Sequence, residues 1–396
     1  MSEQSTLEKL NRQLQRVAGD PFYQARLGNS AVSVNSIAEF EQLPLVEQGA
    51  FAVDAYAEAA PRGSFYNEEI VRINLTPSPQ GLRPVYFTRN DVQQVAKINA
   101  DMMRDAGVTE QDIAITTLSY SLFPAGMMIH EGFEALGAKM IPVGPGDSER
   151  TRALIEQWGV TVLYGNPSFA LKLAEDGIEN IRILFAGGEP FSAIDGYKDG
   201  LRQKMGSDTV LIESYGLAEC TPFARECRFE TGMHIVEEWL YVEVIDPISG
   251  EVLPHGEVGE LVVTHLEKEA MPLIRYRTGD LAMLERAPCG CGRSLTIKGG
   301  IRGRVGSMKK IKGVKVYPEQ IRTLLDDYLA TSGRGFELHT SRSQKSYLGL
   351  LLDGSPLSQE QQTLFIQQFK KALVIVPSEI LFGDITDPKT HWKEID

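Results

Sequence analysis

Residues 112–216 alternate between two hydrophobic patterns. Short runs that are apolar throughout predict buried strands, and stretches with apolar residues three or four apart predict helices between them. The predicted strands are DIAITTLSY, KMIPV, VTVLYG, IRILFAG and TVLIESYG. The predicted helices are MMIHEGFEALGA, ERTRALIEQWG, SFALKLAEDG and IDGYKDGLRQKMG. This order is typical of a parallel sheet covered by helices on both faces, and ligands of such sheets bind beyond the carboxyl ends of the strands.

The pattern changes on either side of this region. Residues 5–18 have the apolar spacing of a helix. After residue 238, LYVEVID and ELVVTH predict two strands that flank a turn-rich segment. From residue 304 onward the pattern predicts the strand and helix order β-α-β-β-α-β of a ferredoxin-like unit. We therefore predict an α/β fold with a large N-terminal domain over 1–303, a β-rich subdomain at about 239–300 and a small, mobile α+β C-terminal domain over 304–396.

Composition narrows the class of partner. A formal net charge of −13 argues against nucleic acid, because phosphate backbones select basic surfaces. No apolar run approaches the ~20 residues that span a bilayer, and the polar start MSEQSTLEKLNRQLQ has no secretory core. We expect a cytoplasmic chain that works on small molecules away from membranes. Whether it forms a homodimer is open.

Three strand-end segments carry candidate chemistry. SYGLAECTP at 214–222 places Glu219, a hard oxygen ligand suited to Mg²⁺, just past a Tyr-Gly turn. RYRTGD at 275–280 places Asp280 in a turn, where its carboxylate could accept both hydroxyls of a ribose. AGGEP at 186–190 has two glycines that permit close backbone approach to a flat ring. Each segment alone could be a plain connection, but the three occur in one order and are followed by GRVGSMKKIKGVKVYP.

With these motifs the sequence resembles the adenylate-forming acyl-CoA ligases, and within them the phenylacetate-CoA ligase-like branch. SYGLAE, EVLPHGEVGELVVTHLEKEAMPLIRYRTGDL and GRVGSMKKIKGVKVYPEQI carry the resemblance most specifically. It implies an enzyme that joins a carboxylic acid to AMP from ATP and releases pyrophosphate. The acyl group then passes to a thiol, usually that of coenzyme A, after the small C-terminal domain rotates.

The resemblance also implies roles for individual residues. Glu219 would hold Mg²⁺, Asp280 would bind the ribose hydroxyls, Ile301 would pack on the nucleotide and Arg304 would reach the ribose. The family's C-terminal catalytic lysine is assigned to Lys389 in preference to Lys393, although two solvated lysines are an equally good interpretation. The positions that would line the adenine and the neighbouring substrate are Gly187, Gly188, Glu189, Pro190, Ser214, Tyr215, Gly216, Leu217 and Ala218.

The sequence departs from the family where ATP phosphates would bind. In NLTPSPQGLRPVYFT at 74–88, Thr76 and Gly81 match the family's phosphate loop, whereas Pro77 and Pro79 each remove a backbone N–H donor. Leu82 occupies the lysine position, and Arg83 could replace the lost positive charge. Elsewhere, Ala218 replaces a hydroxyl donor, and Gly306 and Ser307 replace the hinge aspartates. The AMP half of the site is retained, and the pyrophosphate half is eroded.

The cysteines predict a metal site. PCGCGRS places Cys289 and Cys291 in a tight turn, and ECRFETGMHI adds Cys227 and His234. Three sulfurs and one imidazole suit structural Zn²⁺ in a reducing compartment, with reduced buried thiols as the alternative. Three thiolates would leave a site charge near −1, and the nearby arginines, Arg225 among them, could offset it. Cys220 is left out of this site because it is expected to face the nucleotide.

The acid itself is not identified by the sequence. Tyr120, Phe123, Tyr164 and Gly188 on strand-end loops suggest an aromatic or otherwise flat carboxylate. The first hypothesis is an acid–thiol ligase that uses ATP, Mg²⁺ and coenzyme A. The alternatives are a catalytically reduced homologue that binds AMP or an acyl group, and an acyl transferase or amide-forming ligase of a biosynthetic pathway.

Overall fold

The computed structural model describes residues 2–28, 33–55, 62–78, 81–175, 178, 180–189, 191–194, 196–305, 309–311, 314–316, 318–344, 347–373, 375–385 and 391–396. The chain divides into two compact units, Met1–Ile301 and Arg302–Asp396. No helix in the described part is both long and apolar enough to cross a membrane.

Parallel strands form one end of the first unit's main sheet. They are β3 (Ile113–Thr116), β4 (Lys139–Pro142), β5 (Val162–Gly165), β6 (Ile183–Gly187) and β7 (Val210–Tyr215), in the spatial order β7-β6-β5-β3-β4. Each neighbouring pair is parallel. The predicted α/β arrangement is confirmed, and all five predicted strands are present.

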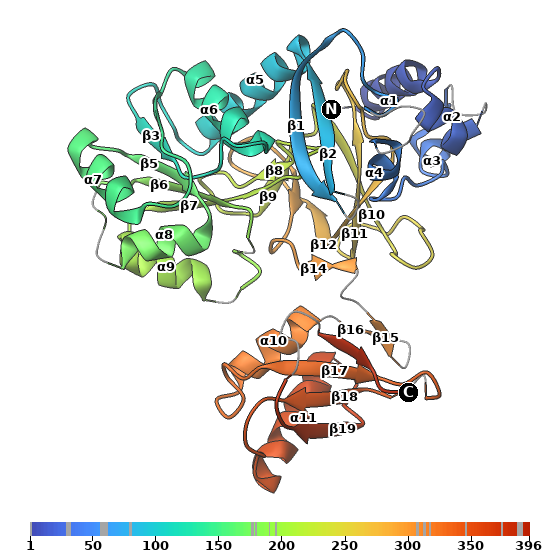
Figure 1. Cartoon of the computed structure of the whole chain (residues 1–396), viewed down its shortest axis with the longest axis vertical. Coiled ribbons are helices and arrows are strands. Elements are labelled where there is room, and N and C mark those ends of the chain that lie inside the picture. Colours follow the sequence, from blue (N-terminus) through green and yellow to red (C-terminus); the bar gives the residue numbers. More distant parts are fainter. Residues whose placement is uncertain are drawn as a thin grey trace. The chain divides into compact units, whose positions relative to one another are not determined.

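Helices cover both faces of this parallel region (Figure 1). One face carries α5 (Arg89–Asp105) and α6 (Pro124–Leu136), and the other carries α7 (Ser148–Trp158), α8 (Pro167–Ala174) and α9 (Tyr197–Met205). Side chains alternate between the faces of a strand. Thus Val162 and Phe185 pack in the α5–α6 layer, and Leu163 and Leu184 pack in the α7–α9 layer.

The sheet continues beyond β7 through antiparallel strands. They are β8 (Ala224–Arg225), β9 (Met233–Ile235), β13 (Leu295–Ile297), β12 (Tyr276–Arg286), β11 (Val258–His265) and β10 (Leu240–Ile245), in that spatial order. The β-rich segment is therefore joined to the parallel strands by one continuous hydrogen-bonded path. The N-terminal helices α1 (Glu3–Val17), α2 (Pro21–Leu27), α3 (Ile37–Phe40) and α4 (Ala50–Ala55) contribute to the same apolar core as these strands.

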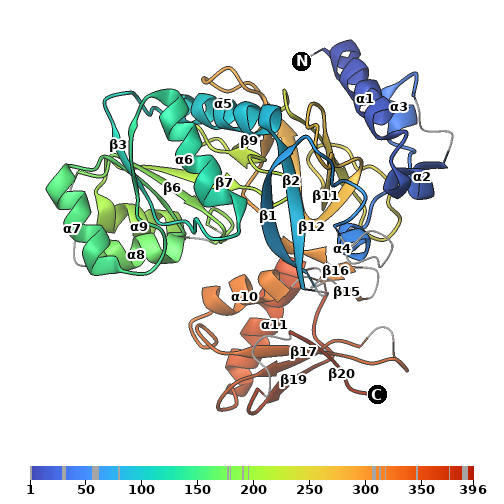
Figure 2. The ribbon, with the colours of Figure 1, turned by 45° about the horizontal axis from the view of Figure 1, so that its top comes forward.

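A separate two-stranded sheet lies over this core (Figure 2). Its strands are β1 (Ile70–Ser78) and β2 (Gly81–Thr88), which pair antiparallel. Helix α5 begins directly after β2, because Thr88 and Asp91 form a capping box that satisfies the first N–H groups of the helix. The hairpin is thereby fixed to a helix that covers the parallel strands.

The second unit has the predicted order of strands and helices, with additional strands. It contains β14 (Gly303–Arg304), β15 (Lys309–Ile311), β16 (Val314–Val316), α10 (Pro318–Asp327), β17 (Phe336–Thr340), β18 (Gly349–Leu352), α11 (Gln359–Leu373), β19 (Glu379–Phe382) and β20 (Trp392–Glu394). The main sheet has the order β19-β18-β17-β20. The first strand of the predicted ferredoxin-like order, β16, instead pairs with β15 in a hairpin, and β20 takes a place beside β17.

Candidate nucleotide and acyl site

Two of the predicted motifs meet at the end of β7. The Tyr215 hydroxyl donates a hydrogen bond of 2.6 Å to Oδ2 of Asp280. Burial and the adjacent Asp280 charge raise the pKa of Tyr215 well above its usual value, so the phenol stays a donor. The ring of Tyr215 also contacts Phe223 edge-on at 4.9 Å. The structure therefore brings SYGLAE and RYRTGD together, although Tyr215 and Asp280 are 65 positions apart in sequence.

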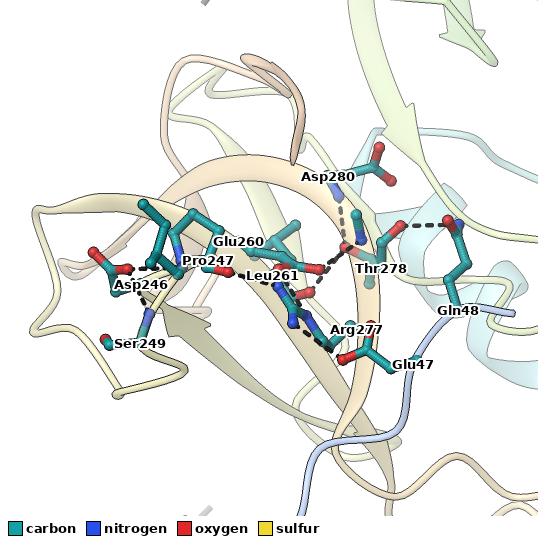
Figure 3. Close-up of polar contacts among 12 residues, drawn as sticks. Glu47, Gln48, Asp246, Pro247, Ser249, Glu260, Leu261, Arg277, Thr278 and Asp280 are labelled. Carbon is teal, nitrogen blue, oxygen red and sulfur yellow. Dashed lines mark hydrogen bonds and ion pairs between the residues drawn. The ribbon is translucent and has the colours of Figure 1, made fainter. Parts of the chain in front are cut away.

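Asp280 lies within strand β12 rather than in the expected turn, and the strand around it is held from several sides (Figure 3). Asp280 N–H donates to Thr278 Oγ1 over 3.0 Å, and that hydroxyl donates to the carbonyl of Leu261. Arg277 donates to Glu260 and, over 3.1 Å, to Glu47. Because these contacts fix the backbone on both sides of Gly279, the carboxylate of Asp280 has a defined direction. Thr278 and Arg277 are positioning residues that the motif alone did not identify.

The glycine loop after β6 is tied to the start of α8. Asn166 Nδ2 donates to the carbonyl of Gly187 over 3.1 Å, and Ser168 Oγ donates to Glu189 over 2.8 Å. Gly188 has φ +83°, and a Cβ there would lie 2.8 Å from Asn166 Nδ2. A Cβ on Gly187 would lie 3.0 Å from the carbonyl oxygen of Ser214. The positive φ at Gly188 and the close contacts at both positions therefore favour glycine; Pro190 lies outside the described residues.

The turn after β7 is closed by its own backbone. Leu217 and Cys220 exchange two N–H···O bonds of 3.0 Å, which turns the chain and presents Glu219. Leu217 and Ala218 are partly buried against the apolar core, and Gly216 is exposed. Cys220 is fully buried within that core, so the expectation that it faces the nucleotide is wrong.

Glu219 is not a solitary carboxylate. Its Oε1 accepts a hydrogen bond of 2.9 Å from the hydroxyl of Tyr276 and forms an ion pair with the Arg83 guanidinium. The side chains of Arg83 and Glu219 are 6% and 7% exposed. Burial lowers the pKa of Arg83. Arg83 was considered as a substitute for the missing loop lysine, and the structure places it on the carboxylate expected to hold Mg²⁺.

The degenerate phosphate loop is a regular hairpin rather than an open loop. Thr76 pairs with Arg83, Pro77 with Leu82, and Ser78 with Gly81. In an antiparallel ladder every second residue of each strand directs its N–H to the partner strand. Those N–H groups are not available to phosphate oxygens, and proline has none. Pairing up to Ser78 thus adds to the loss of donors expected from the sequence; Pro79 lies outside the described residues.

The three candidate substrate side chains have different surroundings. Tyr120 is half-buried and its hydroxyl lies 3.0 Å from His130 Nδ1. Phe123 is 38% exposed at the start of α6. Tyr164 is buried and stacks on Phe185 with ring centroids 5.2 Å apart. Among the described residues, no hydrogen bond or ring contact joins these three side chains to one another, so their shared role stays a prediction.

The predicted metal ligands converge. The ligand atoms of Cys227, His234, Cys289 and Cys291 all lie within 4.8 Å of one another. Cys227 Sγ lies 3.6 Å from Cys289 Sγ, and Cys291 Sγ lies 3.4 Å from His234 Nε2. A tetrahedron with ~2.3 Å Zn–S bonds has edges of roughly 3.7 Å, so the donor set fits zinc. Arg225, expected to offset the charge of this site, instead bonds to Ser214 and Asn99.

The remaining assignments involve both units. Ile301 is partly buried against the core of the first unit. Arg304 belongs to the second unit, in β14, and its contact with the ribose stays a prediction. Lys389, together with the hinge positions Gly306 and Ser307, lies outside the described residues.

Comparison with known proteins agrees with this geometry. Residues 85–266 match the family of AMP-binding enzymes. The chain is 35% identical over 321 residues to the phenylacetate-coenzyme A ligase of Thermus thermophilus. The aligned region covers 77% of this chain and 70% of that protein. The chain is 34% identical over 332 residues to the phenylacetate-coenzyme A ligase of Pseudomonas putida, which covers 79% and 74%.

This chain belongs to the phenylacetate-CoA ligase-like branch of the adenylate-forming enzymes. A crystal structure of 2-hydroxyisobutyryl-CoA ligase, in complex with 2-HIB-AMP and CoA, superposes with a TM-score of 0.86 at 25% identity and covers 100% of this chain and 91% of that one. As a member of this family the chain is an ATP-dependent acid–thiol ligase that works through an acyl-adenylate.

Proposed function

We propose that this ligase activates a flat carboxylic acid as its acyl-AMP and transfers the acyl group to coenzyme A. The observation that carries the proposal is the Tyr215–Asp280 contact, which joins the two nucleotide motifs at the carboxyl end of the parallel sheet. The names of the relatives support coenzyme A as the thiol acceptor. The aromatic side chains of Tyr120, Phe123 and Tyr164 near the strand ends support a flat acyl group.

In this proposal the AMP portion is held by groups that the fold has already fixed. Asp280 accepts the ribose hydroxyls, and Tyr215 packs along the adenine while its hydroxyl orients Asp280. The Gly187–Glu189 backbone approaches the other face of the ring, because no side chain intervenes there. Pre-oriented groups of this kind stabilise developing charge without rearranging during the reaction.

Arg83 supplies fixed positive charge for the ATP phosphates. Its Nη1 is buried and has no hydrogen-bond partner within the described part of the chain, so a phosphate oxygen would satisfy it. Glu219 is the carboxylate that would hold Mg²⁺ together with substrate phosphates. Its Oε1 already binds Tyr276 and Arg83, so we assign Oε2 to the ion. With few backbone donors on the hairpin, we expect adenylation to be slower than thioester formation.

The second unit completes the active site in the proposal. Arg304 reaches the ribose, Lys389 binds the charge that develops during adenylation, and rotation about residues 304–307 separates the two half-reactions. The family supports this division of labour. The metal site is proposed to be structural, since it joins the β8–β9 segment to the β12–β13 turn within the first unit.

A second candidate is a nucleotide-binding homologue that does not cleave ATP, which the closed hairpin favours. Incubation with ATP, Mg²⁺, coenzyme A and a panel of flat acids distinguishes the two. The ligase gives acyl-CoA, AMP and pyrophosphate in equal amounts, detected by mass spectrometry. The variant Asp280→Asn, which keeps the side-chain size, is expected to lose most of this turnover. Absence of acid-dependent AMP from every acid would contradict the ligase proposal and leave the binding protein.

A further inference from the structure

A buried arginine without a carboxylate partner lies beside the proposed acyl site. Arg225 in β8 is 3% exposed. Its Nε donates to Ser214 Oγ over 3.1 Å, and its Nη2 donates to Asn99 Oδ1 over 2.8 Å and to the Tyr164 hydroxyl over 3.4 Å. The third nitrogen, Nη1, is buried and has no hydrogen-bond partner among the described residues. The groups that do bind this cation are therefore neutral.

Two other buried arginines of the same unit show the contrast. Arg275 is 2% exposed and donates three hydrogen bonds to Glu243, the shortest of 2.7 Å. Arg83 is paired with Glu219. A guanidinium does not lose its proton in proteins, and a buried charge without a counter-charge is strongly unfavourable. Within the described residues, no carboxylate pairs with Arg225, so an anionic ligand could supply its counter-charge.

The position of Arg225 indicates which ligand. Arg225 pairs with Ser214 in the β7–β8 ladder, one residue before Tyr215 of the nucleotide motif. Its guanidinium carbon lies 5.6 Å from the ring centroid of Tyr164 and 5.5 Å from that of Phe185. These two stacked rings lie near the carboxyl ends of β5 and β6, where sheets of this kind bind ligands. The cation therefore lies beside Tyr164, one of the side chains proposed to contact the acyl group.

We propose that Arg225 binds a second carboxylate of the acid substrate, so that the preferred substrates are dicarboxylic acids with a flat, apolar middle. This inference rests on the proposed ligase function. Nη1 and Nη2 form a planar fork that binds a carboxylate through two parallel hydrogen bonds. The Tyr164 contact is the longest of the three, so one substrate oxygen replaces it at Nη2 while the other binds Nη1. Ser214 and Asn99 keep the guanidinium oriented.

The proposed pairing predicts strong discrimination between acids. A site built to bind a polar group rejects an analogue that lacks it by about 10²-fold or more, because the buried group of the protein is left unpaired. We therefore expect kcat/KM of the wild-type chain to be at least ~100-fold higher for a dicarboxylate than for the matched monocarboxylate. The reacting carboxyl is the same in both members of a pair, so the nucleotide contacts do not contribute to the ratio.

The test uses the full chain with ATP, Mg²⁺, coenzyme A and three matched pairs of acids. The pairs are benzoate and terephthalate, phenylacetate and 4-carboxyphenylacetate, and cinnamate and 4-carboxycinnamate, which vary the distance between the carboxyls. Acyl-CoA formation is measured for the wild type, Arg225→Met and Arg225→Lys. The control is Arg228→Met, because Arg228 is a neighbouring arginine that is exposed. Melting temperature and AMP affinity report whether each variant folds.

The expected result is that the wild-type chain prefers the dicarboxylate in at least one pair. This preference should be lost in Arg225→Met and unchanged in Arg228→Met. It should be weakened in Arg225→Lys, because an ammonium group cannot donate two parallel hydrogen bonds to a carboxylate. Equal kcat/KM for both members of every pair would overturn the inference while the ligase function stands. A uniform loss in Arg225→Met for mono- and dicarboxylates alike would make Arg225 structural and also overturn it. If no acid yields acyl-CoA, the ligase function fails, and the inference with it. Should Arg225→Met not fold, the wild-type ratio decides alone.

Discussion

Replacing Arg83 by methionine is expected to destabilise the first unit strongly. The side chains of Arg83 and Glu219 are 6% and 7% exposed, so the variant buries the Glu219 carboxylate without its cation. Breaking a buried ion pair from one side costs about 3–5 kcal/mol. For a large domain each kcal/mol lowers Tm by ~2–4 °C, which gives a decrease of roughly 6–20 °C. Differential scanning calorimetry on the full chain can follow the transitions of the two units separately.

The matched control is Arg104→Met. Arg104 pairs with Asp101 on the surface, where the two side chains are 56% and 45% exposed, and such pairs contribute only about 0–1 kcal/mol. The double variant Arg83→Met/Glu219→Leu should recover part of the loss, because it removes the unpaired carboxylate as well. The reasoning is refuted if Arg83→Met melts at the same temperature as Arg104→Met, or if the double variant is less stable than Arg83→Met.

Three further predictions concern the metal, the ribose and acid stability. Protein purified without added metal should contain about one zinc per chain by elemental analysis. The variant Cys289→Ser/Cys291→Ser should lose the zinc and be less stable, but should bind AMP as tightly as the wild type. Wild-type protein without zinc would contradict this prediction. Asp280→Ala should weaken AMP binding at least about tenfold, or ~1.4 kcal/mol, as measured by isothermal titration calorimetry. An unchanged affinity for AMP would mean that Asp280 does not bind the ribose. Burial opposes ionisation of Asp112, but hydrogen bonds from Arg182, Thr109 and Thr161 lower its pKa to about 2. Because the pKa of Asp112 is lower in the folded than in the unfolded chain, its ionisation contributes about 2 kcal/mol to the free energy of unfolding above about pH 4, and this contribution is lost toward pH 2. In urea unfolding, the free energy of unfolding should therefore decline less over this pH range in Asp112→Asn than in the wild type.

The layered part of the fold could be predicted because its signal is local. Buried strands such as Val162–Gly165 are apolar throughout, whereas the helices between them bury one face and have apolar residues three or four positions apart. The spacing of apolar residues along the sequence therefore indicates both kinds of element. The four metal ligands were also within reach of the sequence. Thiols are uncommon, and Cys289 and Cys291 are two positions apart, so few partners had to be considered.

Contacts between distant segments could not be predicted in the same way. Nothing in the sequence around Arg83 indicates that its partner is Glu219, or that Tyr276 donates to the same oxygen. Arg225 follows the same rule: its position two residues before Cys227 suggested the metal site, but its guanidinium bonds to Ser214 and Asn99, which are distant in sequence. The hairpin at 76–83 was missed because prolines and glycine predict a turn without giving the pairing of its flanks.

The central claim is that this chain forms an acyl-adenylate, slowly, at a retained AMP site. The most direct measurement compares the two half-reactions in the wild-type chain. One is acid-dependent exchange of pyrophosphate into ATP, and the other is formation of acyl-CoA from a supplied acyl-adenylate. The account predicts that both occur and that the exchange is at least about tenfold slower, since each donor lost to a charged phosphate costs ~1.5–3 kcal/mol. Thioester formation without exchange for any acid, or exchange as fast as thioester formation, would contradict it.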